Sequence, residues 1–149
     1  MRIIHRCIGT NVILKEMGVR NNDFCSFCNT TKDSIQHMFW QCNHIKEFWQ
    51  LLANMINEKC SHASNIRISE SLALLGIDKD LHIDTMFYLI ILFAKQYIYY
   101  CKLDNNIPVL HIFIKKLKKR YEIEEYIARK TFTYNEFITK WILYKPVLD

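Results

Sequence analysis

The chain has 149 residues, half of them hydrophobic, and a formal net charge of +5 at pH 7. That length favours a single domain, and the hydrophobic fraction is sufficient for a packed core. The longest apolar run, residues 86–94, is much shorter than the roughly 20 residues that cross a bilayer, and no apolar signal-like stretch follows the charged N-terminus. We therefore expect an intracellular protein of the cytoplasm or the nucleus, with no membrane partner and no secretion.

The predicted elements are helices, because three glycines and two prolines leave little turn chemistry for many strands. After Cys42, apolar residues recur at spacings of three and four, so a helix is expected to start near His44. Ser69 can cap a short helix that runs through Ala73 and is stopped by Gly76.

Three longer helices follow in the C-terminal half. The spacing of apolar residues predicts a long, mostly buried helix over residues 83–101, which Asn105-Asn106 breaks. Pro108 is well placed at the start of the next helix. Five apolar side chains are expected on one face of that helix: Leu110, Phe113, Ile114, Leu117 and Tyr121. A last amphipathic helix is predicted over residues 134–143. The fold class is therefore all-α.

Cys25, Cys28, His37 and Cys42 carry the strongest signal, in the pattern C-x2-C-x8-H-x4-C. Thiolate and imidazole are ligands that Zn²⁺ prefers, and four of them complete a tetrahedral shell. Because no secretory signal is present, clustered cysteines favour a metal over disulfides. We predict one structural Zn²⁺ in a CCHC zinc knuckle of about residues 23–44, packed on a helical bundle.

Other cysteines and histidines leave some alternatives for the ligand set. His44 is a spare candidate ligand two residues after Cys42, and the Cys60/His62 pair is another. Cys7, Cys60 and Cys101 lie outside the motif and are interpreted as buried thiols.

The motif and its flanking residues resemble the zinc-binding region at the C-terminal end of LINE-type (non-long-terminal-repeat) retrotransposon reverse transcriptases. The likeness rests on residues 23–29 and 35–42, on the lead-in over residues 7–19 with its Thr-Asn pair, on Phe48-Trp49, and on tail segments 73–76 and 92–99. The resemblance implies Cys42 as the fourth ligand. It also implies a zinc-binding region over residues 1–60 and a helical C-terminal tail over residues 61–149.

Catalytic residues are not expected in this chain. Four protein ligands leave no open zinc position for water. The sequence has no Gly-rich phosphate loop, and it lacks the Asp-Asp pair that the resembled polymerases need for divalent metal. Its densest acidic group is Glu122, Glu124 and Glu125, of which only two can approach a shared ion on one helix. The chain is interpreted as a non-catalytic tail, with an upstream polymerase domain or another protein as a possible partner.

The excess of basic residues lies at the C-terminal end, where residues 108–149 carry nine basic and five acidic side chains. Lys115, Lys116, Lys119 and Arg120 are expected to point away from the apolar stripe of their helix. The residues alone fit an ordinary solvated face equally well, but the resemblance favours binding of template RNA, with DNA left open. Trp40 is open between core packing and stacking on bases, whereas Phe48 is expected in the core.

The function predicted from the sequence is a zinc-stabilised, nucleic-acid-binding C-terminal module of a retrotransposon reverse transcriptase. The alternatives are a zinc-stabilised helical module for protein interaction or structure, and a decayed mobile-element fragment without retained function.

Overall fold

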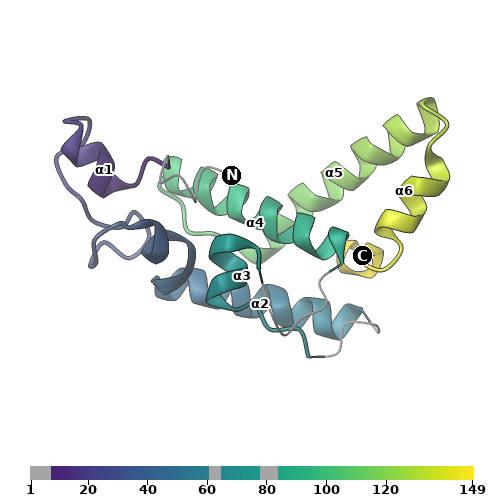
Figure 1. Cartoon of the computed structure of the whole chain (residues 1–149), viewed down its shortest axis with the longest axis horizontal. Helices are drawn as coiled ribbons and strands as arrows, with labels where there is room; N and C mark the ends of the chain where they lie inside the picture. Colours follow the sequence, from purple (N-terminus) through teal and green to yellow (C-terminus); the bar gives the residue numbers. More distant parts are fainter. Residues whose placement is uncertain (1–7, 61–64, 78–83) are drawn as a thin grey trace.

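The computed structural model describes residues 8–60, 65–77 and 84–149, and most of these residues are helical (Figure 1). Within these ranges, the one β-type pairing is an isolated bridge between Phe24 and Lys32. The predicted all-α class is therefore confirmed. The helical elements are α1 (Asn11–Glu16), the π-helical turn η1 (His37–Gln41), α2 (Asn43–Lys59), α3 (Glu70–Leu75), α4 (Thr85–Leu103), α5 (Leu110–Lys130), α6 (Tyr134–Trp141) and the 3-10 turn η2 (Lys145–Leu148).

Local sequence signals set the ends of the short helices. The hydroxyl of Thr10 accepts a hydrogen bond from the Ile13 N–H and caps α1. Ser69 caps α3 in the same way through the Leu72 N–H, as predicted, and Gly76 ends that helix in the left-handed region at φ +73°. Only a residue without a Cβ adopts that backbone conformation at little cost, so the sequence predicted both ends of α3.

The long helices also agree with the predicted pattern, with one difference. The side chain of Asp84 caps α4 by accepting the Phe87 N–H; Ile83, which the prediction placed in this helix, lies outside the described residues. Pro108 does not begin α5, because Val109 is the N-cap and Leu110 is the first helical residue. The hydroxyl of Tyr97 holds Val109 extended by accepting its N–H and donating to its carbonyl, so the helix starts two residues after Pro108.

The core is one continuous cluster to which the segment around the predicted knuckle and the helices both contribute. Phe48 of α2 lies at its centre and is 2% exposed. Its ring centroid lies 5.5 Å from that of Trp49, 5.9 Å from Tyr97 and 5.7 Å from Phe113. Aromatic pairs at these distances add to the free energy gained by burying their area. The expectation that Phe48 packs in the core is confirmed.

The apolar stripe of α5 faces this core, since Phe113 and Leu117 are buried while Leu110, Ile114 and Tyr121 pack against it partly buried. Figure 1 shows α5 and α6 as a hairpin that projects from α4 at one end of the molecule, with α1 at the other end. The ring of Tyr121 closes the hairpin by packing against Phe137 and Trp141 of α6, at centroid distances of 5.0 and 5.2 Å. In the described ranges, no helix is long and apolar enough to cross a bilayer.

Candidate metal centre

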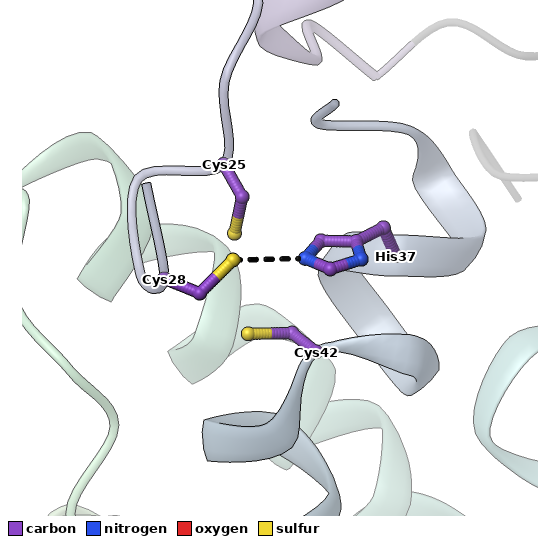
Figure 2. A group of neighbouring side chains, drawn as sticks. All are labelled: Cys25, Cys28, His37 and Cys42. Atoms are coloured by element: carbon purple, nitrogen blue, oxygen red, sulfur yellow. Dashed lines mark hydrogen bonds between the residues drawn. The ribbon is translucent and has the colours of Figure 1, made fainter. Parts of the chain in front are cut away.

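The structure brings the four predicted ligands together. Their ligand atoms, the Sγ atoms of Cys25, Cys28 and Cys42 and a ring nitrogen of His37, all lie within 4.8 Å of one another. Figure 2 shows the four side chains converging on one point, from the turn at residues 25–28, from η1 and from the start of α2. Among the described residues, no other group of three or more cysteines, histidines or carboxylates is placed to hold a metal ion.

A tight turn places the first two thiols side by side. The Asn29 N–H donates to the Cys25 carbonyl at 2.9 Å, and Asn29 adopts the left-handed region at φ 54°. The Phe27 N–H points at the Sγ of Cys25, 3.4 Å away. Backbone pairing of Cys25 with Thr31 closes the loop. Asparagine tolerates positive φ better than most residues, so the sequence is suited to this turn.

The second pair of ligands is set by the π-helical turn η1. His37 is the first residue of η1, and its N–H donates to the Ser34 hydroxyl at 3.0 Å. Five residues later, the Cys42 N–H donates to the His37 carbonyl at 3.0 Å. The wider π turn thus brings the i, i+5 pair of His37 and Cys42 within one turn of each other.

The donor set fits a zinc ion. A tetrahedral site with Zn–S bonds of about 2.3 Å separates its ligand atoms by roughly 3.8 Å. Cys28 Sγ and the His37 Nε2 are 3.4 Å apart, so small side-chain adjustments would let the four donors close around one ion. Cys25, His37 and Cys42 are buried and Cys28 is half-buried, which keeps the centre away from bulk water.

Electrostatics prepare the thiols for metal. Partial burial raises the pKa of Cys28, but hydrogen bonds from the Thr30 hydroxyl and nearby backbone N–H groups outweigh it and lower that pKa to about 5. The hydrogen bond between Cys25 and Cys42, together with burial, raises the pKa of Cys25, while the same bond lowers the pKa of Cys42. Thiolate is the form that binds metal, so the lowered pKa values of Cys28 and Cys42 favour metal binding.

The alternative ligands do not join the centre. His44 lies two residues into α2 and Cys60 at the far end of that helix, and neither belongs to the cluster. Cys60 and Cys101 are buried free thiols, as predicted. Cys7 and His62 lie outside the described residues.

Aromatic residues dock the predicted knuckle on α2. Phe27 and Phe39 are buried in the shared core, and the carbonyl of Phe39 accepts the indole N–H of Trp49 at 2.8 Å. Trp40 is only half-buried and lines a groove beside α2, which we call the Trp40 groove. Phe27 and Phe39 therefore dock the segment on α2, whereas Trp40 packs partly buried at the edge of the core and faces the groove.

The four predicted basic residues are exposed on α5, but their surroundings are less simple than a solvated face. Lys116, Lys119 and Arg120 border a groove of about 410 Å³ between α4 and α5, the α4–α5 groove. Arg120 lies over the ring of Phe93 at 4.1 Å and pairs with Glu124 at 3.1 Å. The sequence did not predict this groove, because it depends on the angle between two helices.

The acidic residues of α5 are engaged separately. One carboxylate oxygen of Glu124 accepts from the indole N–H of Trp141 at 2.9 Å and from Lys140 at 2.8 Å. Glu125 pairs with Arg129 at 2.7 Å. They serve the α5–α6 hairpin and do not converge on a shared ion site.

A buried ion pair between Lys102 and Asp33 was not predicted from the sequence. Lys102 of α4 is 1% exposed and reaches Asp33, which is 0% exposed. The sequence held a signal for this, because Lys95 and Lys102 continue the helical spacing of Ile91 and Ile98 on the buried side of α4. Lysines at core positions of a buried helix indicate specific partners.

The fold and the cluster define a helical protein with a Cys3His centre of the zinc-binding type. Comparison with protein families gives this class a more specific description. Residues 1–49 match the model of a family described as zinc-binding in reverse transcriptase, and all four cluster residues lie in that segment. The predicted resemblance to the zinc-binding region of reverse transcriptases is thereby confirmed for residues 1–49, and the family described is a zinc-binding module rather than the catalytic part of a reverse transcriptase. No curated protein and no solved structure matches the chain significantly.

Proposed function

We propose that this chain is a non-catalytic C-terminal module of a LINE-type retrotransposon reverse transcriptase, which holds template RNA and is stabilised by one structural zinc ion. The family match over residues 1–49, together with the four-ligand cluster inside it, carries the proposal. Four protein donors fill a tetrahedral shell, so the ion stabilises the fold and leaves no position for a reacting water.

The basic face of α5 supports the RNA part of the proposal. Lys115, Lys116, Lys119 and Arg120 are all exposed. Among the described residues, no carboxylate pairs with any of the three lysines, so their charges are available for phosphates. Each phosphate neutralised by a cation releases counterions, which makes the affinity depend on salt.

Salt dependence of RNA binding tests this proposal. Fluorescence anisotropy with a labelled single-stranded RNA, repeated over a range of salt, gives the slope of log affinity against log salt. For single strands the slope is about 0.7 per phosphate contact, so changing the four α5 residues to Gln should flatten it by up to about 3.

A charge-matched variant controls this measurement. Lys32, Lys59, Lys130 and Lys145 are exposed and lie outside residues 115–120, so changing these four to Gln removes equal charge away from the basic face and should flatten the slope much less. Gln is a good helix former, and circular dichroism should show parental helicity for both variants. Parental affinity and slope in the α5 variant would overturn the RNA role of this face.

One observation favours a second candidate function, a protein-interaction module. The α4–α5 groove has an apolar lining that includes Tyr100, Ile123 and Ile127, and each of these side chains is about half exposed. Grooves between helices are common sites for an amphipathic helix of a partner protein. Two variants separate the functions: Ile123 and Ile127 changed to Ser, and the four basic α5 residues changed to Gln. If both variants bind RNA with the parental affinity, the protein-interaction function takes precedence.

A further inference from the structure

A second concave surface, the Trp40 groove, lies directly beside the metal centre and has the chemistry of a nucleotide site. Its volume is about 490 Å³, within the roughly 300–1,000 Å³ typical of small-ligand sites. Trp40, which supplies an aromatic ring, belongs to η1 two residues before the metal-ligand position Cys42. The remaining lining comes from α2, with Lys46, Gln50 and Asn54, and from residues 66–68, which lead into α3.

The walls of the Trp40 groove are held in place by the fold. The side-chain amide of Asn57 accepts the Ile66 N–H at 2.8 Å and donates to the Ile66 carbonyl at 2.9 Å. Ile68 is buried on the other side of Arg67, so the backbone that carries this arginine is fixed at both neighbours. The hydrogen bond from Trp49 to Phe39 fixes η1 against α2. A preformed site loses little conformational entropy when a ligand binds.

The polar groups of the groove are arranged by helical spacing. Lys46, Gln50 and Asn54 are exposed and follow one another at four-residue intervals, so they form a row along α2. Arg67 is exposed on the facing segment. No carboxylate lines the groove, and among the described residues neither Lys46 nor Arg67 has an ion pair. The groove therefore offers two free cations, two amides and one aromatic ring.

These groups match the parts of a nucleotide. An accessible indole stacks on any base, lysine and arginine hold phosphates, and side-chain amides can hydrogen-bond the edge of a base. The centres of protein–protein interfaces are depleted in charged residues, whereas this groove carries two cations beside an aromatic ring. The mixture favours a single-stranded nucleic acid over a peptide.

We infer that the Trp40 groove is a binding site for one nucleotide of single-stranded RNA, with the base stacked on Trp40 and the adjoining phosphates held by Lys46 and Arg67. The inference rests on the proposed function, because it names a second contact of the same module with RNA. It is nevertheless separable, since the groove shares no lining residue with the α4–α5 groove.

Tryptophan fluorescence of the full chain, loaded with zinc, tests the site directly. The other two tryptophans, Trp49 and Trp141, are 2% and 1% exposed, so quenching by a bound base reports on Trp40. Titration with single-stranded oligouridine and oligoadenosine should quench the emission, and the same sequences as RNA duplexes should not. Trp40→Leu should remove the quenching and weaken the affinity about 5- to 150-fold, whereas Trp40→Phe should retain most of the affinity.

The cations are tested by a charge-matched pair of variants. Changing Lys46 and Arg67 to Gln should reduce the salt slope by about 1.4, the value for two phosphate contacts with a single strand. Changing Lys32 and Lys59 to Gln removes the same charge from exposed positions outside the groove and should leave the slope nearly unchanged. Parental quenching and slope in the Lys46/Arg67 variant would overturn the inference, as would an absence of quenching by any oligonucleotide.

The same titrations separate this site from the α5 face. If the groove variants bind RNA like the parent while the fourfold α5 variant loses affinity, the nucleotide site is wrong and the proposed function stands. If the groove variants lose quenching and affinity while the α5 variant binds like the parent, the nucleotide site stands and the α5 face is not the RNA contact.

Discussion

The ammonium group of Lys102 lies 3.3 Å from the carboxylate of Asp33, and both side chains are almost fully buried. Lys102 also donates to the carbonyl of Gly9, and the same carboxylate oxygen of Asp33 accepts the Asn11 N–H at 2.6 Å. Burial lowers the pKa of Lys102, and the charge of Asp33 opposes that shift. This contact ties α4 to the segment that carries the metal cluster.

Breaking the pair should destabilise the protein strongly. Lys102→Met leaves the Asp33 carboxylate buried without its counter-charge, so the free energy of unfolding should fall by about 3–5 kcal/mol. Adding Asp33→Asn removes the orphaned charge and keeps an acceptor for the Asn11 N–H, so the double variant should recover part of the loss. Urea unfolding measures both, and Lys118→Met serves as an exposed control. A double variant less stable than Lys102→Met would contradict this account.

The metal should be inseparable from the folding of the segment that holds it. In small zinc modules binding is worth on the order of 10 kcal/mol. Metal analysis in reducing buffer should give one zinc per chain, and none for Cys25→Ser/Cys28→Ser. The matched control is Cys60→Ser/Cys101→Ser, which changes two buried thiols outside the cluster and should retain the metal. Parental zinc content in the first variant would exclude this site.

Chelation should act mainly on the residues around the centre. Hydrogen exchange followed by mass spectrometry should show that protection is lost over about residues 20–45 and largely kept in α4 and α5. Because Trp49 of α2 donates to the carbonyl of Phe39, we also expect the first half of α2 to lose part of its protection. Uniform loss of protection along the chain would contradict a local role for the metal.

The left-handed glycines offer a matched comparison of two costs. Gly18 and Gly76 have nearly the same φ, +72° and +73°, but a Cβ at Gly76 would collide with the ring of Tyr88, whereas nothing lies within 4 Å of one at Gly18. Gly18→Ala should cost about 1 kcal/mol of stability. Gly76→Ala should cost about 2–4 kcal/mol, because the clash adds to the backbone strain. Equal losses in thermal or urea unfolding would show that the Tyr88 ring moves aside freely.

Lys95 should make stability depend on pH in a defined direction. Burial lowers its pKa to about 8, while its Nζ donates to the Leu74 carbonyl at 2.9 Å. The folded protein thus releases this proton near pH 8, and the unfolded chain near the ordinary lysine value of 10.5. The unfolded state binds more protons between these values, so the contribution of Lys95 to stability rises with pH there.

Comparison with Lys95→Met isolates this contribution from other alkaline effects. From pH 7 to pH 9.5 the parent should gain about 1–2 kcal/mol of stability relative to the variant. Urea unfolding of both proteins at several pH values provides the measurement. The parent should therefore gain stability relative to the variant as the pH rises. If this difference stays constant or falls with pH, the folded environment of Lys95 does not disfavour its charge.

Features governed by neighbours in sequence were predictable here. The ends of α3 follow from Ser69 and Gly76, and the metal cluster follows from ligand types and their spacing. Features that depend on how helices meet were not predictable. The helical wheel correctly made Lys116 and Lys119 exposed, but only the angle between α4 and α5 places them beside an apolar groove.

Trp40 illustrates a second limit of prediction from sequence. Its position in an aromatic-rich segment fits packing and stacking equally well, and the outcome depends on a distant segment. The wall opposite Trp40 comes from residues 66–68, which Asn57 positions through two hydrogen bonds. No spacing rule relates those residues to Trp40, since the connection between them is a tertiary contact.

The hydrogen bond between Lys102 and Gly9 can form only late during synthesis of the chain. The two residues are 93 positions apart in the chain. At elongation rates of about 5–20 residues per second, Gly9 leaves the ribosome roughly 5–20 seconds before Lys102, whose ammonium group donates to its carbonyl. All four cluster residues emerge well before Lys102, so metal capture is available to the nascent chain first. Docking of α4 then places Lys102 against Gly9 and Asp33 and completes the packing of the N-terminal segment.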